Sequence, residues 1–91
     1  MYSTIRILVF GKVTGVSFRS EAKAYADSIG VVGSVRNLEK SLVEIIAQGD
    51  EDSIGDFLSW CTKGSKKSKV KSIEYHYLEN YDLCSDFEII E

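Results

Sequence analysis

The sequence has few side chains from which a metal site or a disulfide framework could be built. Its 91 residues include two cysteines, Cys61 and Cys84, and one histidine, His76. A four-ligand zinc site cannot be assembled from these residues without recruiting carboxylates. We therefore expect no metal and no cofactor, and we interpret both cysteines as free thiols. A disulfide would need an oxidising compartment, and nothing in the sequence favours one.

The sequence also lacks a membrane span, an export signal and an excess of positive charge. No apolar stretch approaches the roughly 20 residues of a membrane-spanning helix. The N-terminal residues 1–6 do not have the layout of a signal peptide. A net charge of −3 and a pI of about 5.1 give no general attraction to nucleic acid or to an anionic membrane. We expect a cytoplasmic monomer that binds neither, so that any anion site must be local.

A length of 91 residues with 44% hydrophobic content supports one domain, over residues 1–91, with a modest core. Hydrophobic periodicity predicts that this domain is of the α+β class. Strand patterns occupy 5–10, 31–37, 42–48, 70–78 and 87–90, and helical patterns occupy 18–30 and 50–64. Ser17 is predicted to cap the first helix and Gly30 to end it. The order β-α-β-β-α-β predicts a ferredoxin-like sandwich, with two helices on one face of an antiparallel sheet and a short C-terminal edge strand at 87–90.

The stretch Gly11-Lys12-Val13-Thr14-Gly15-Val16-Ser17-Phe18-Arg19 connects the first strand to the first helix. A glycine-spaced turn there aims backbone N–H groups into one concavity, to which the helix N-terminus adds partial positive charge. Arg19 can point back into it and grip two phosphate oxygens with its planar guanidinium. Two glycines alone would favour an ordinary tight turn, but the ordered nonapeptide favours a site. The predicted phosphate-binding residues are Lys12, Val13, Thr14, Gly15, Val16 and Arg19.

This loop is neither a Walker loop nor a dinucleotide fingerprint, since it has neither Gly-Lys-Ser/Thr nor Gly-x-Gly-x-x-Gly. It resembles the signature Gly-x-Val-Gln-Gly-Val-x-Phe-Arg of the acylphosphatase family, with Thr14 where that pattern usually has Gln. Farther on, Gly33-Ser34-Val35-Arg36-Asn37 resembles the family pattern Gly-x-Val-x-Asn. The resemblance covers nearly the whole chain, and the two motifs together are specific.

The resemblance implies hydrolysis of small acyl phosphates to a carboxylate and inorganic phosphate. In the family, the arginine of the first motif holds the phosphate and the asparagine of the second positions the attacking water; here these are Arg19 and Asn37. An acyl phosphate expels a carboxylate whose conjugate acid has a pKa of roughly 4, so no general acid is needed. Backbone N–H groups and one arginine can supply the positive potential without a metal. The substrate itself is then expected to accept the proton of the water.

The sequence departs from the family pattern at the hairpin turn and at the C-terminus. Glu39-Lys40-Ser41 replaces the usual Asp-Gly turn, so we expect a left-handed, strained residue there. The chain ends with Ile90-Glu91 instead of an aromatic residue. These departures concern stability and substrate fit more than the reaction.

Two hypotheses of other classes stay open. RNA-recognition modules share the element order, and Lys63, Lys66, Lys67, Lys69 and Lys71 form a local basic patch. The RNP1 aromatic pattern of such modules is absent from 42–49, so we interpret the lysines as a solvated loop. A non-catalytic phosphate-metabolite sensor would keep the anion site and lack turnover. Release of inorganic phosphate from benzoyl or acetyl phosphate distinguishes the sensor from the enzyme.

Overall fold

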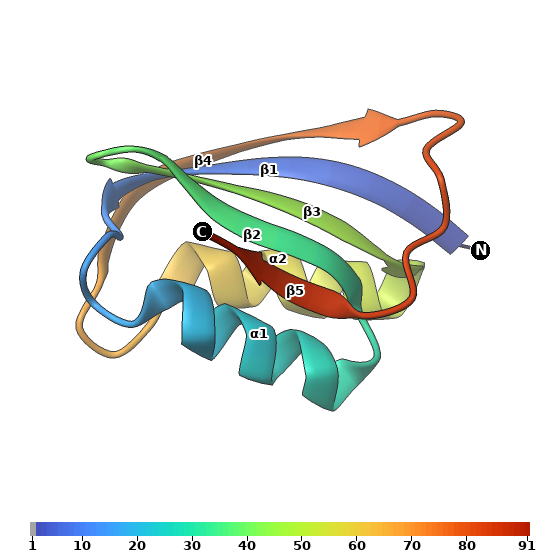
Figure 1. Cartoon of the computed structure of the whole chain (residues 1–91), viewed down its shortest axis with the longest axis horizontal. Helices are drawn as coiled ribbons and strands as arrows, with labels where there is room; N and C mark the ends of the chain where they lie inside the picture. Colours follow the sequence, from blue (N-terminus) through green and yellow to red (C-terminus); the bar gives the residue numbers. More distant parts are fainter. Residues whose placement is uncertain (1) are drawn as a thin grey trace.

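The computed structural model describes residues 2–91, which form two helices packed against one face of a five-stranded sheet (Figure 1). The elements in chain order are β1 (Tyr2–Lys12), α1 (Phe18–Ile29), β2 (Val32–Glu39), β3 (Leu42–Asp50), α2 (Glu51–Lys63), β4 (Lys69–Leu78) and β5 (Phe87–Ile90). The predicted ferredoxin-like order and the C-terminal strand are confirmed. The strands begin and end within a few residues of the predicted bounds.

The sheet is mixed, whereas the sequence predicted an antiparallel one. Its strand order is β4-β1-β3-β2-β5; the first four strands pair antiparallel, and β5 pairs parallel to β2. This direction follows from the antiparallel pairs, because β4 ends at the end of the sheet where β2 begins. A strand that follows a direct crossing from that end must run the same way as β2.

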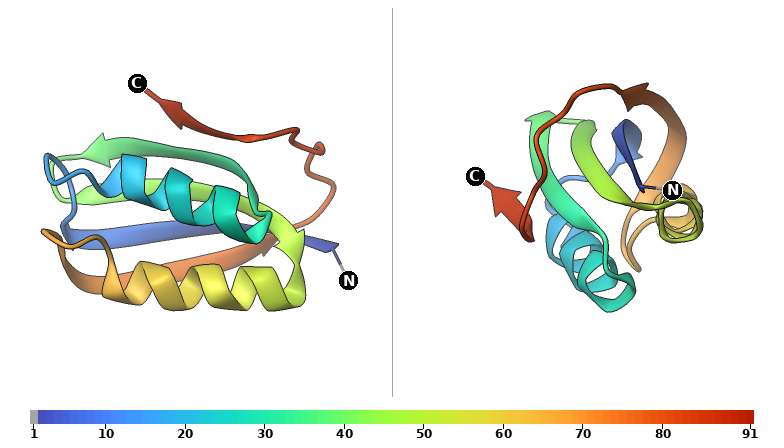
Figure 2. Two further views of the ribbon diagram at one scale, coloured as in Figure 1. Left: turned by 90° about the horizontal axis from the view of Figure 1, so that it is seen from below. Right: turned by 90° about the vertical axis from the view of Figure 1, so that its right-hand side faces the viewer.

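The segment between β4 and β5 crosses the face of the sheet opposite the helices (Figure 2). Gln48, on β3, is fully buried beneath it. The Gln48 Nε2 donates to the carbonyl oxygen of Asp82 at 2.6 Å, and the backbone N–H of Cys84 donates to Gln48 Oε1 at 2.8 Å. The side-chain amide of Gln48 thus bonds one donor and one acceptor of the crossing segment. These two bonds fix the position of the segment shortly before β5 begins.

The core lies between the sheet and the helices. Ile5, Ile7 and Val9 of β1 are fully buried on the helix side. At the start of α1, Phe18 packs against Trp60 of α2 with ring centroids 5.2 Å apart. Because Phe18 is buried at the first position of α1, the helix N-terminus and the neighbouring Arg19 are held against the core.

The two helices begin differently. Asp50 caps α2, since its Oδ1 accepts from the backbone N–H of Ser53 at 2.9 Å. Ser17 stands at the N-cap position of α1, as predicted, but its side chain makes no capping hydrogen bond. Its backbone is left-handed, with φ 60° and ψ 22°, instead of the extended geometry from which a capping hydroxyl reaches the first-turn amides. Gly30 ends α1 in the left-handed region, as predicted.

The hairpin turn does not contain the expected left-handed residue. Among residues 2–91, the non-glycine residues with positive φ are Ser17 and Asn80, and neither lies in the turn. The β2–β3 register shifts between Asn37 and Glu39, so that β2 carries one extra residue before the chain reverses. Because of this extra residue, the hairpin closes without a residue in the left-handed conformation that favours glycine.

The structure has two free thiols, as expected, and an exposed histidine. Cys61 is buried and Cys84 half-buried, and both are free thiols. Burial raises the pKa of the Cys61 thiol. His76 is exposed on the edge strand β4. Within residues 2–91, neither helix is long and apolar enough to cross a bilayer.

Candidate active site

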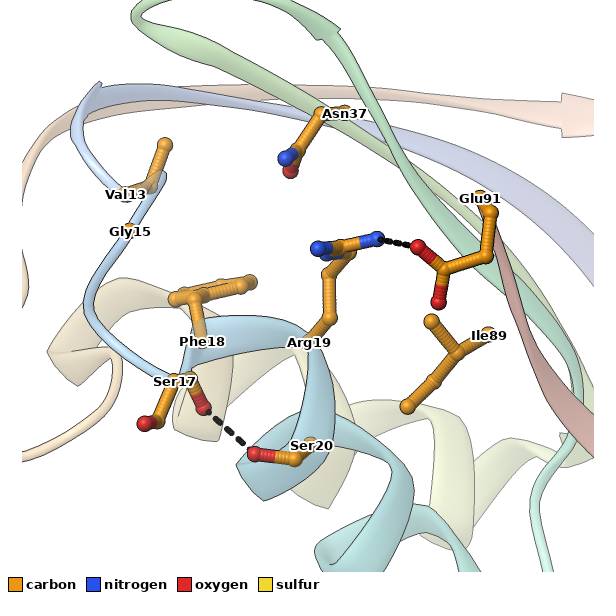
Figure 3. A pocket seen from close by; sticks show the side chains of 9 residues that line it. All are labelled: Val13, Gly15, Ser17, Phe18, Arg19, Ser20, Asn37, Ile89 and Glu91. Atoms are coloured by element: carbon orange, nitrogen blue, oxygen red, sulfur yellow. Dashed lines mark hydrogen bonds and ion pairs between the residues drawn. The ribbon is translucent and has the colours of Figure 1, made fainter.

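A cavity of about 180 Å³ lies where the β1–α1 loop, the first turn of α1, the end of β2 and the C-terminus meet (Figure 3). It is lined by Val13, Gly15, Ser17, Phe18, Arg19, Ser20, Asn37, Ile89 and Glu91. Arg19 comes from α1 and Asn37 from β2, and their side chains point into the same space (Figure 3). The structure therefore brings together the two residues that the separate sequence motifs singled out.

The loop into α1 has alternating backbone geometry. Gly15 has φ 69° and Ser17 has φ 60°, whereas Val16 between them has a negative φ. Backbones that alternate in this way form concave nests of N–H groups that attract anions. Within residues 2–91, the backbone amides of residues 14–17 have no hydrogen-bond acceptor. Gly15 and Ser17 line the cavity, so the unpaired donors of these two residues, together with the N-terminus of α1, make this wall electropositive.

The carbonyl oxygens of the same loop are engaged elsewhere. Ser65 Oγ donates to the carbonyl oxygen of Val16 at 3.2 Å. The carbonyl oxygen of Ser17 accepts from Ser20 Oγ and from the backbone N–H of Glu21, both at 3.1 Å. Holding these acceptors away from the cavity leaves the N–H groups as the polar face that an incoming anion can meet.

The residues of the predicted phosphate-binding loop line two different spaces. Val13 and Gly15 line the cavity, while Lys12 and Thr14 line a neighbouring groove. Val16 lines neither space and packs half-buried against the core. Any contact of Lys12, Thr14 or Val16 with an anion in the cavity would therefore involve the main chain.

Thr14 and Gly11 hold the loop in place. The Thr14 hydroxyl donates to the carbonyl oxygen of Lys40 at 2.5 Å, which ties the loop to the β2–β3 turn. Gly11 has φ 136°, and a Cβ at this position would collide with the backbone carbonyl of Lys69 on β4. Gly11 is thus required both by its own backbone angle and by the close approach of β4.

Glu91 and Ile89 line the cavity although sequence reasoning did not select them. Arg19 Nη1 lies 3.5 Å from Glu91 Oε1, and the Glu91 side chain is 88% exposed. The parallel register pairs Val35 with Ile89 and Arg36 with Ile90, so one further step brings Glu91 level with Asn37. No local pattern could have revealed this, because it depends on which strand β5 pairs with.

Potential metal ligands do not gather here. Across the part of the chain that the structure describes, no group of three or more His, Cys, Asp or Glu side chains is arranged to hold a metal ion.

Comparisons with known proteins agree on one family. A sequence model of the acylphosphatase family matches residues 5–89. An acylphosphatase of Methylococcus capsulatus is 37% identical over 86 residues, which cover 94% of this chain and 94% of that protein. The crystal structure of acylphosphatase from Bacillus subtilis has a TM-score of 0.93 and 33% identity, with 100% of both chains covered. An acylphosphatase structure from Coxiella burnetii has a TM-score of 0.92 and 31% identity, with 98% of this chain and 93% of that chain covered. The chain therefore belongs to the acylphosphatase family.

Proposed function

We propose that this cavity hydrolyses the carboxyl–phosphate bond of small acyl phosphates, with Arg19 and Asn37 as its catalytic residues and no metal. Membership of the family makes the chain an acylphosphatase, a hydrolase that acts on acyl phosphates. The proposal adds how it does so. The observation that carries it is the meeting of Arg19, Asn37 and an unpaired row of backbone amides at one small cavity.

The loop and Arg19 bind the phosphoryl group. The free amides of Gly15 and Ser17, which line the cavity, and the positive end of α1 attract the charge of the phosphate. Arg19 adds a planar pair of donors, which matches two phosphate oxygens at once. Such groups are already oriented before substrate arrives, so they stabilise the equatorial oxygens without further rearrangement.

Asn37 aligns the attacking water. Its amide enters the cavity from β2, on the side facing Arg19 (Figure 3). A side-chain amide both accepts and donates hydrogen bonds, so it can hold a water with one lone pair directed at phosphorus. Fixing that geometry lowers the barrier by removing the orientational cost of a second reactant.

The bond changes need no protein acid. The water oxygen forms a bond to phosphorus as the bond from phosphorus to the acyl oxygen breaks, and the carboxylate leaves with the electron pair. The water proton passes to a phosphoryl oxygen of the substrate. Glu91 is the one carboxylate among the residues that line the cavity, and its Oε1 lies beside Arg19. The leaving carboxylate is stable at neutral pH without protonation.

We further propose that the enzyme is cytoplasmic and monomeric, that residues 1–91 form one domain, and that it has no nucleic acid partner. The sequence of β3 supports the last point, because it carries no aromatic residue on which a base could stack.

Hydrolysis of benzoyl phosphate in the presence of a chelator tests the mechanism. We expect full turnover, competitive inhibition by inorganic phosphate, and much slower hydrolysis of alkyl phosphate esters, whose alkoxide leaving groups need a proton. Loss of benzoyl phosphate hydrolysis on chelation would contradict the metal-free mechanism. Efficient hydrolysis of an alkyl phosphate would reveal a general acid that this mechanism lacks.

A further inference from the structure

A second hollow, of about 750 Å³, lies beside the β1–α1 loop. Lys12 and Thr14 line it, while the intervening Val13 lines the cavity, so the loop separates the two spaces. We call this second hollow the lysine groove. Its other walls come from the β2–β3 turn and from the start of β4, which meet at the left of Figure 1.

The lysine groove concentrates positive charge on an acidic protein. It is lined by Lys12, Lys40, Lys69 and Lys71, all of which are exposed. None of these four side chains forms an ion pair within residues 2–91. Because the net charge of the chain is −3, the groove is a local reversal of the overall field.

Two of these lysines oppose each other across paired strands. Lys12 and Lys69 are register partners in the β1–β4 pair. The Gly11 backbone approaches Lys69 so closely that a Cβ would not fit. Like charges directly opposite each other on adjacent strands destabilise a sheet. An anion bound between them would convert this repulsion into attraction.

The groove is not purely polar. Phe10 and Val70, both half-buried, form an apolar part of its lining. Its volume lies within the range typical of pockets for small organic ligands. We propose that the lysine groove binds a small organic polyanion, with an apolar or planar body against Phe10 and Val70 and negative groups between the lysines. This site goes beyond the proposed hydrolysis and does not depend on it.

A pair of double variants tests the assignment. Lys69→Gln/Lys71→Gln removes two charges from the groove, and Lys66→Gln/Lys67→Gln removes two from the adjacent loop, outside it. Calorimetric titrations use ATP, tripolyphosphate and adenosine as probes, with chelator present and inorganic phosphate saturating the cavity. These probes carry charge and ring, charge alone, and ring alone.

We expect ATP to bind more tightly than tripolyphosphate, and adenosine to bind too weakly to detect. The groove variant should weaken ATP binding by about tenfold, which corresponds to about 1.4 kcal/mol. The loop variant should change it by less than about twofold, since exposed charges that do not line the groove are screened by salt. Both variants should hydrolyse benzoyl phosphate at the wild-type rate, which keeps this test separate from that of the catalytic mechanism.

Several results would overturn the inference. Equal weakening by both double variants would assign ATP binding to general charge. ATP binding that is detected only when inorganic phosphate is left out would place ATP in the cavity, and equal affinity for tripolyphosphate and ATP would remove the role of Phe10 and Val70. An affinity for oligonucleotides that rises with their length would indicate a nucleic-acid surface instead. Thermal unfolding gives an independent check: at low salt, Lys69→Gln should raise the Tm of the free protein, and an unchanged or lower Tm would contradict repulsion between Lys12 and Lys69.

Discussion

The carboxylate of Glu91 lies 3.5 Å from the guanidinium of Arg19, at the cavity where the phosphate is proposed to bind. Figure 3 shows the Glu91 side chain reaching from the end of the chain toward Arg19. A phosphate that binds Arg19 must compete with this carboxylate or draw the guanidinium away from it. The strand β5 therefore places a charge that opposes anion binding.

Replacing Glu91 with glutamine should tighten binding of inorganic phosphate. An exposed ion pair is worth up to about 1 kcal/mol, so we expect the inhibition constant for phosphate to fall by about two- to fivefold. The difference should shrink at high salt, because both charges are accessible to counterions. Glu88→Gln, on β5 close to Glu91 but outside the cavity, is the matched control. Equal tightening by both substitutions would point to net charge instead of the contact with Arg19.

Arg19 and Asn37 should fail in different ways when replaced. Arg19→Ala should weaken phosphate binding and turnover together, because a charged partner is lost from ground state and transition state alike. Arg19→Lys should recover little, since a point charge does not reproduce the planar fork. Steady-state kinetics with phosphate as competitive inhibitor measures both quantities.

Asn37→Ala should lower turnover by at least about a hundredfold while phosphate binding is retained, because the amide aligns water and does not carry the phosphate charge. Circular dichroism must first show that the variant is folded, since Asn37 lies next to the irregular register of the hairpin. Wild-type turnover in Asn37→Ala would contradict the role in aligning water, and a loss of phosphate affinity as large as that of Arg19→Ala would remove the division of labour.

Glu44 should make the stability depend on pH. Its carboxylate accepts from Arg6 at 2.5 Å and from Arg36 at 2.6 Å, on the sheet face opposite the helices. Burial by itself would raise the pKa of Glu44, but hydrogen bonds and charges from Arg36 and Arg6 outweigh it and hold the pKa below its ordinary 4.5. Since the folded protein then binds this proton more weakly than the unfolded chain, the contribution is complete above the unfolded pKa and is lost as pH falls through the folded one.

Urea unfolding of wild type and Glu44→Gln tests this. At pH 7 the variant should be less stable by about 1–2 kcal/mol, since the glutamine oxygen still accepts one hydrogen bond but carries no charge. On acidification the wild type should lose stability more steeply than the variant, and the two curves should converge. Parallel curves would show that another carboxyl carries the acid sensitivity.

Ser17 and Ser41 should respond oppositely to glycine. Ser17 holds a left-handed backbone without a side-chain capping bond, so Ser17→Gly should stabilise the fold by about 0.5–1 kcal/mol. Ser41 lies in the hairpin turn with a negative φ, so Ser41→Gly should destabilise it by about 0.5–1 kcal/mol. Thermal unfolding measures both, and a higher Tm for Ser41→Gly would show that the turn is strained after all.

Much of the fold was readable from local patterns. Apolar residues recur at helical spacing in α1 and α2, Asp50 precedes α2 as a cap, and Gly30 follows α1. These signals lie within a few residues of one another, so they can be recognised in the sequence without knowledge of the tertiary structure. The left-handed residue was predicted in the hairpin turn but lies at Ser17. The backbone angle of Ser17 depends on how the loop meets α1, and the register shift before the turn depends on pairing with β3.

Local sequence patterns were enough to predict the element order and the family, and to select Arg19 and Asn37 as the candidate pair. Long-range contacts place these two residues at one cavity, bring Glu91 beside them, and direct Lys12 and Thr14 to a separate groove. The two sets of features depend on interactions of different range along the sequence. Helix and strand propensity act between near neighbours, but strand partners, register and the path of the chain across the sheet are set by contacts between residues far apart in sequence.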